Sequence, residues 1–212
     1  RPREFDIEEA IDQAMLVFWQ HGYTGSGLNA LCQAMGIVRG SFYKAFGSKQ
    51  ALFLLVLARY ERDHVDGAVE ELRHGTGSGS QRIERIFKGS LGLIKGGDER
   101  GCLLCNTASG SSMENDEIRL TIAAQLDKLT AGFSCALQSD QREGQSGLNP
   151  DSDLRARARQ LTMKYVGLRI LGRGEVAHAL TVRAEHVSKS AREKLEAAGG
   201  KIELVEKVAA AA

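Results

Sequence analysis

The sequence contains little that would bend or cross-link the chain. Only 2 prolines occur in 212 residues, so long uninterrupted helices are possible. The 4 cysteines, at 32, 102, 105 and 135, are too few and too scattered for a disulfide scaffold. No run approaches the roughly 18 consecutive apolar residues that a membrane span needs, and no secretory leader pattern is visible at the start. We therefore expect a cytoplasmic protein that does not engage a membrane.

Neither sign of charge is in excess. Lys and Arg number 28 and Asp and Glu 27, which gives a formal net charge of +1. Such a chain has no general attraction for nucleic acid, so any contact of that kind must come from a local basic patch. Signals for catalysis are also missing, because the 5 histidines form no cluster with acidic residues and no glycine-rich phosphate loop precedes a helix. We expect no enzyme and no cofactor.

Apolar residues recur at helical spacing along most of the chain, and this predicts an all-α protein. Asp6 and Glu9 resemble a capping box and open a helix over 7–20. Ser26 is expected to cap a second helix that Gly36 closes.

The longest predicted helix follows Ser48, which is expected to cap it, and runs to about residue 73. Beyond it we predict helices near 81–95, 101–112, 115–138 and 153–172, with a glycine- and serine-rich linker at 74–81 and a polar loop at 139–153.

Three short helices joined by tight turns predict a helix-turn-helix, in which the last helix enters the major groove of DNA. In "GIVRGSFYKAF", residues 36–46, Phe42 and Phe46 are four apart and share the inner face of this last helix. Arg39, Tyr43 and Lys44 then lie on its outer side. Arginine can bridge guanine O6 and N7, whereas tyrosine and lysine more often hold phosphates.

The segment "FDIEEAIDQAMLVFWQHGYTGSGLNALCQAMGIVRGSFYKAFGSKQAL" closely resembles the DNA-binding domain of the TetR family of bacterial repressors. "HGY", "SFYKAF" and "GSKQAL" are landmarks of that family. Val38 and Gly27 depart from it, since hydroxyl or larger polar residues are common at those positions. The resemblance implies that Lys49, at the start of the fourth helix, contacts phosphate. The candidate DNA contacts are Ser26, Arg39, Gly40, Ser41, Tyr43, Lys44 and Lys49.

The resemblance also implies a domain order and a function. Residues 1–50 would form the helix-turn-helix domain, and residues 51–172, with a connecting helix over 49–73, a helical bundle that binds a ligand and dimerises. We expect a repressor that binds palindromic double-stranded operator DNA as a homodimer and is released by a small-molecule inducer. The inducer itself is not evident from the sequence.

Within the body, "RGCLLCNTASG" at 100–110 resembles the sixth-helix segment of many family members and places Cys102 and Cys105 on one helical face. One C-x-x-C supplies only two ligands, so we expect no metal site. A thiol sensor, with a thiolate favoured by Arg100 and the helix start, competes with plain packing of two small buried hydrophobes, which we favour. The candidate pocket residues are Phe87, Leu91, Cys102, Leu104, Cys105, Ile122, Leu126, Met163 and Tyr165.

Residues from about 170 to 207 resemble a different protein, the C-terminal segment of bacterial large-subunit ribosomal protein fifteen, most clearly in "LTVRAEHVSKSAREKLEAAGGKIELV". Two interpretations of the tail at 173–212 stay open. Val176, Leu180, Ala184, Val187, Ala191 and Leu195 have the spacing of a helix that would replace the last dimerisation helix. The second interpretation is the arrangement of the ribosomal protein, a strand, a helix and a strand, with Gly199-Gly200 before the second strand "KIELV". A ribosome-associated RNA-binding protein is therefore the alternative function, and an enzyme comes third.

Overall fold

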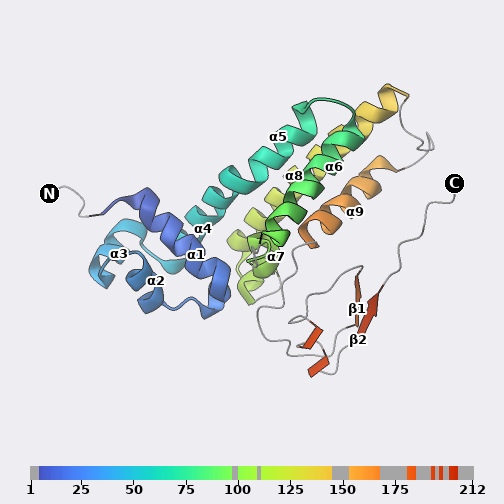
Figure 1. Ribbon diagram of the computed structural model, residues 1–212. Helices are drawn as coiled ribbons and strands as arrows, with labels where there is room; N and C mark the ends of the chain where they lie inside the picture. Colours follow the sequence, from blue (N-terminus) through green and yellow to red (C-terminus); the bar gives the residue numbers. More distant parts are fainter. Residues whose placement is uncertain are drawn as a thin grey trace.

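The three N-terminal helices lie at one end of the molecule, and the remaining helices extend away from them (Figure 1). The computed structural model describes residues 5–96, 100–108, 111–144 and 153–167, and in the C-terminal part residues 181–184, 192–193, 196–197 and 201–204. From residue 5 to residue 167 every regular element described is helical, as predicted.

The N-terminal helices are α1 (Ile7–Gly25), α2 (Leu28–Ala34) and α3 (Arg39–Phe46). The carboxylate of Asp6 accepts hydrogen bonds from the backbone N–H groups of Glu8 and Glu9, which confirms Asp6 as the cap of α1. Gly36 follows α2 at a φ of 66°, a left-handed conformation that favours glycine, so the expected end of the second helix is confirmed.

The connecting helix is one continuous rod made of α4 (Lys49–Tyr60), a π-helical segment η1 (Glu61–Val65) and α5 (Asp66–His74). Ser48 caps it through a hydrogen bond from the backbone N–H of Ala51 to its Oγ, at 3.0 Å. The long predicted helix is thus confirmed, but its π-helical middle was not predicted. Side-chain spacing alone does not distinguish an i→i+5 turn from an α-turn.

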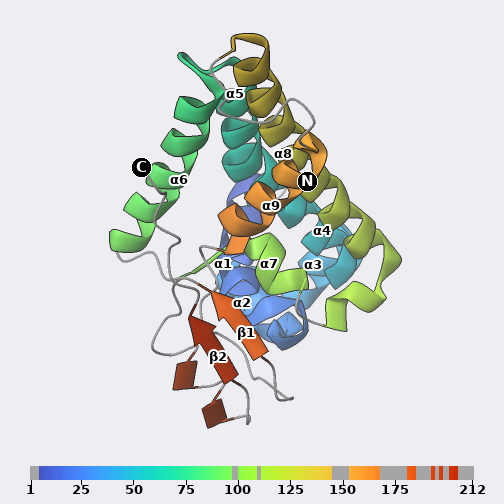
Figure 2. The same ribbon diagram turned by 90° about the vertical axis from the view of Figure 1, so that its right-hand side faces the viewer.

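The body continues with α6 (Gly79–Lys95), α7 (Leu103–Ala108), a 3₁₀ turn η2 (Ser111–Glu114), α8 (Asp116–Arg142) and α9 (Leu154–Gly167). Helix α8 is the centre of this bundle, because α5, α6 and α9 all pack against it. In Figure 2, α9 lies in front of the bundle, with α6 on one side of it and α8 on the other.

Two predicted connections are shorter than expected. The linker predicted at 74–81 is limited to residues 75–78, since α5 ends at His74 and α6 begins at Gly79. The predicted loop at 139–153 starts late, because α8 continues to Arg142. The reason is tertiary: the buried carboxylate of Asp140 accepts hydrogen bonds from the backbone N–H groups of Gly79 and Ser80.

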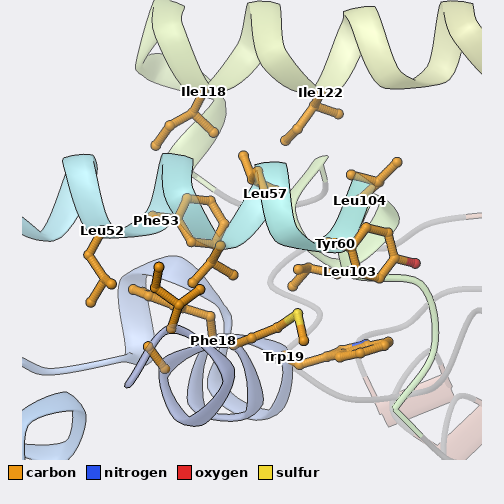
Figure 3. Packing of buried hydrophobic residues seen from close by; sticks show 14 of the residues in the cluster. Phe18, Trp19, Leu52, Phe53, Leu57, Tyr60, Leu103, Leu104, Ile118 and Ile122 are labelled. Atoms are coloured by element: carbon orange, nitrogen blue, oxygen red, sulfur yellow. The ribbon is translucent and has the colours of Figure 1, made fainter. Parts of the chain in front are cut away.

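The main hydrophobic core joins the N-terminal helices to the body. Figure 3 shows Phe53 and Leu57 of α4 between Phe18 of α1 and Ile122 of α8. The rings of Phe18 and Phe53 are 4.7 Å apart between centroids, and both side chains are fully buried. A second cluster, formed by Leu72, Ile86, Phe133, Ala136, Leu137 and Ala158, holds the far part of the bundle together.

In the tail, β1 (Thr181–Ala184) pairs in parallel with β2 (Lys201–Leu204), with Thr181 opposite Lys201. The helical interpretation is therefore wrong at Ala184, and the strand interpretation holds for these two segments. Parallel strands need a long crossover, which the 16 residues from 185 to 200 are long enough to provide. The other members of the predicted helical stripe lie outside the described residues. In the described part of the chain, no helix is both long and apolar enough to cross a membrane.

Candidate functional site

Helix α3 presents a polar outer face because two phenylalanines anchor its inner face. Phe42 is fully buried and Phe46 nearly so, and their ring centroids are 5.7 Å apart. Tyr43 is 55% exposed, and Arg39 and Lys44 are also exposed. The predicted division of α3 into an inner aromatic side and an outer side with cations is confirmed.

Other α3 candidates are less constrained. Gly40 is exposed, and a Cβ added there would meet no heavy atom within 4 Å. Ser41 is half-buried. Val38 occupies the N-cap position of α3 without a side-chain hydrogen bond to the helix, in keeping with its lack of a hydroxyl.

Arg39 is held in place by the preceding helix. Its Nε–H and Nη2–H groups both donate to Oδ1 of Asn29 on α2, at 3.0 and 2.7 Å. Asn29 was not among the predicted residues. Ten positions separate it from Arg39, so only the angle between α2 and α3 brings the two side chains together.

Lys49, at the first position of α4, lies with its Nζ 4.6 Å from the centroid of the Tyr23 ring. Partial burial lowers the pKa of the Lys49 ammonium. The cation–π contact holds the ammonium over Tyr23, while the residue itself lies at the N-terminus of α4, where the partial positive charge of the helix favours an anion.

Ser26 does not act as expected. The N-cap of α2 is Gly27, and Ser26 is fully buried, with its Oγ donating to the carbonyl oxygen of Gly22 at 2.6 Å. A hydroxyl satisfied inside the protein cannot cap α2 or reach a phosphate in this structure. The expected cap was wrong because the chain between α1 and α2 turns Ser26 inward toward α1.

Most of the candidate pocket residues pack in the two hydrophobic clusters. Leu104, Ile122 and Cys102 are buried in the main core, with Cys105 and Leu126 packed against it. Phe87 packs against the second cluster, and Tyr165, whose ring centroid is 5.6 Å from that of Phe87, packs against both clusters.

Leu91 and Met163 are 39% and 65% exposed, and their role as pocket lining stays a prediction. Each is apolar at a helical position, but its side chain is exposed in this structure. Whether such a residue faces a core or the solvent depends on which helix packs against it.

An open groove runs between α6 and α9, with α8 beneath it. Its volume is about 580 Å³, within the usual size range of small-molecule sites. Of the nine predicted lining residues it contains only Phe87. The groove is lined by Ser80, Ile83, Glu84, Phe87, Leu137, Arg157, Gln160, Leu161 and Lys164.

Cys102 lies at the start of α7, 6% exposed, where the hydroxyl of Tyr60 donates to its Sγ at 3.5 Å. Hydrogen bonds from the Cys105 thiol first, then from Tyr60 and the backbone, outweigh burial and lower the pKa of Cys102. The same pairing raises the pKa of Cys105. Arg100, which was expected to favour this thiolate, is not among the groups that shift the pKa of Cys102, and its guanidinium lies 4.5 Å from the centroid of the Trp19 ring.

Two contacts join α1 to the body that sequence reasoning did not anticipate. Trp19 on α1 donates from Nε1 to the carbonyl oxygen of Gly101 at 3.1 Å. Arg59 on α4 forms ion pairs with Glu8 and Asp12 of α1, at 2.6 and 2.9 Å. Among the residues that the structure describes, no three His, Cys, Asp or Glu side chains are placed to hold a metal ion.

Comparison with known proteins matches two parts of the chain to two families. The family described as "Bacterial regulatory proteins, tetR family" matches residues 10–56. A family of ribosomal proteins that includes 50S-L15 and 50S-L18e matches residues 137–203. The large ribosomal subunit protein uL15 of Desulfosudis oleivorans is 59% identical, but over only 39 residues, which are 18% of this chain and 26% of that protein.

The regulator match extends over most of the chain. An uncharacterised HTH-type transcriptional regulator of Bacillus subtilis, YezE, is 27% identical over 174 residues, which cover 82% of this chain and 89% of YezE. A structure of the TetR family transcriptional regulator CifR, a cysteine mutant complexed with 26-bp double-strand operator DNA, is 31% identical with a TM-score of 0.70. That alignment covers 80% of this chain and 88% of CifR. This chain, with its helix-turn-helix and helical body, therefore belongs to the TetR family of transcriptional regulators.

Proposed function

We propose that this regulator is a repressor that binds palindromic operator DNA as a homodimer in the cytoplasm and is released by a small-molecule inducer. The observation that carries the proposal is the outer face of α3, where Arg39, Tyr43 and Lys44 are exposed around a buried phenylalanine anchor. In this proposal Arg39 reads a base edge, and Tyr43, Lys44 and Lys49 hold phosphates. The DNA-bound state of the CifR relative supports this use of the helix.

The homodimer follows from how one such domain reads DNA. A single α3 spans only one half-site, so a two-fold pair of subunits is needed to reach half-sites about 34–36 Å apart or somewhat more. The flank of α9 that carries Arg155, Arg159 and Met163 is exposed, and Met163 gives it an apolar centre. We propose this flank as part of the contact between subunits.

Release by an inducer requires a path from the body to α1. The continuous core and the contacts of Trp19 and Arg59 across the boundary support such a path. An inducer shifts the equilibrium only if it binds the DNA-competent form and the released form unequally. Packed helices have discrete arrangements, so a small shift in the body can move both α3 helices out of register.

The proposal is tested by selecting bound fragments from genomic DNA and measuring their affinity by fluorescence anisotropy, with and without candidate ligands. We expect a palindromic consensus, two subunits bound per site and weaker binding with the inducer. A ribosomal RNA fragment serves as the competing ligand, because the uL15-like tail is the one feature that favours RNA. Preference for that RNA over every duplex would overturn the repressor function.

A further inference from the structure

The groove between α6 and α9 has an apolar floor and a cationic rim. Its floor is apolar, formed by Ile83, Phe87, Leu137 and Leu161. Its α9 rim is cationic, because Arg157 and Lys164 line it. These two cations are seven positions apart, so they lie two helical turns, or about 10 Å, apart on the same side of α9.

The cations on this rim are available to a ligand. Neither Arg157 nor Lys164 forms an ion pair within the part of the chain that the structure describes, and both are exposed. The one acidic lining residue, Glu84 on the opposite wall, is 2.7 Å from the Nζ of Lys88. That hydrogen bond and the nearby charge lower the pKa of Glu84, so its negative charge is present but neutralised locally. The groove as a whole therefore carries an excess of positive charge.

We infer that this groove binds a small amphipathic anion, a molecule with an apolar body and a carboxylate or similar anionic head. The apolar floor would cover the body, and Arg157 or Lys164 would hold the head. A neutral hydrophobic ligand would leave both cations without a partner, and a cationic ligand would be repelled by them. This inference rests on the proposed function in one respect only, in that it names the chemical class of the inducer.

The groove is connected to the continuous rod of α4, η1 and α5 through helix α8. Both α6 and α9 pack on α8, and α8 in turn packs on α4 and α5 of the rod. The buried side chain of Gln125 donates from Nε2 to the carbonyl oxygen of Leu57 at 3.0 Å. Lys128 forms ion pairs with Glu61 and Asp66, at the two ends of the π-helical segment. A ligand that spreads α6 and α9 would therefore shift α8 against α4.

The test compares three probes of equal chain length, octanoate, octan-1-ol and octylammonium, by isothermal titration calorimetry of the full chain at low salt. We expect octanoate to bind about five-fold or more tighter than octan-1-ol, and octylammonium to bind most weakly, since each exposed cation contributes about two- to five-fold. Equal affinities for octanoate and octan-1-ol would overturn the inference.

Variants at exposed positions locate the site. Arg157→Gln with Lys164→Gln should abolish the preference for octanoate over octan-1-ol. Arg73→Gln with Arg119→Gln is the matched control, because it makes the same charge change at two exposed positions that do not line the groove and should leave the preference intact. If both pairs behave alike, the groove is not the site. Gln160→Glu should weaken octanoate and strengthen octylammonium, and the opposite result would also contradict the inference.

Operator affinity is measured on the same samples, so that failure of the two proposals can be told apart. Octanoate that binds in the groove but leaves operator affinity unchanged supports the ligand class and removes the inducer role. A chain that binds no duplex DNA loses the proposed function, while the calorimetric comparison still decides the chemistry of the groove.

Discussion

Asn29 on α2 accepts two hydrogen bonds from Arg39 on α3, through one oxygen and the Nε and Nη2 edge of the guanidinium. This contact fixes the plane of the arginine side chain before any DNA is present. It also leaves the Nη1 and Nη2 end of the guanidinium able to donate to a guanine. Asn29 is therefore a positioning residue for the base-reading side chain that we propose.

Arg39→Ala should relax specificity at one base position and cost about 1–3 kcal/mol on the preferred operator. Asn29→Ala should affect the same base position less, by about 0.5–1.5 kcal/mol, because it only frees the arginine side chain. Both are measured by anisotropy on the operator and its single-base variants. The two losses should not add in the double variant. Equal losses on operator and random DNA would contradict a base-reading role for Arg39.

Lys49→Ala should weaken binding to every DNA sequence about equally and reduce the slope of log K against log salt by about one unit. The reason is that one phosphate contact releases about one counterion. Lys88→Ala, an exposed lysine on α6 far along the chain from the helix-turn-helix, is the control and should leave the slope unchanged. If Lys49→Ala also leaves it unchanged, Lys49 contacts no phosphate.

Gly79→Ala should lower the free energy of unfolding by about 1–3 kcal/mol, measured by urea denaturation. A Cβ at position 79 would overlap the carbonyl oxygen of Ala136, a backbone atom that cannot move aside alone. Gly89→Ala on the same helix meets no atom within 4 Å and should stabilise the protein by about 0.5–1 kcal/mol. A stable Gly79→Ala variant would show that α6 can slide along α8.

The lowered pKa of Cys102 predicts a pH dependence of stability. A thiol that ionises with a pKa of about 6 when folded, against an ordinary value of 9.0, favours the folded state at high pH. The free energy of unfolding should therefore rise from about pH 6 to about pH 9, and Cys102→Ser should remove this rise. Cys105→Ala should raise the pKa of Cys102 more than Tyr60→Phe does, as measured by ultraviolet absorbance of the thiolate. No pH dependence of this sign would mean that Cys102 stays protonated.

Modification of Cys102 should loosen the operator complex several-fold. Added bulk in a packed interior costs about 1–3 kcal/mol, and the side chain lies against Tyr60, whose ring is 5.3 Å from that of Trp19 on α1. Operator affinity is measured before and after mild peroxide or N-ethylmaleimide, in the wild type and in Cys102→Ser. Unchanged affinity with Cys102 shown by mass spectrometry to be modified excludes a sensor. A Cys102 that never reacts leaves only a packing role.

The sequence alone was sufficient for the elements whose signals are local. Asp6 and Ser48 were correctly identified as caps because a capping side chain bonds to backbone groups within the first turn of its own helix. The inner face of α3 followed from two phenylalanines one turn apart. The resemblance to the TetR family likewise rested on a nearly continuous stretch of chain.

The tertiary structure alone decided which distant side chains meet. Ser26 has the residue type of a cap, yet the path of the chain between α1 and α2 buries it. Helix α8 extends beyond its predicted end because the Asp140 carboxylate accepts hydrogen bonds from the start of α6, 60 residues or more away in sequence. The groove is formed by side chains of α6, α8 and α9 that are far apart in sequence, and Leu91 and Met163 do not line it. Helical spacing tells which residues share a face, but only the packing of helices against one another decides what that face contacts.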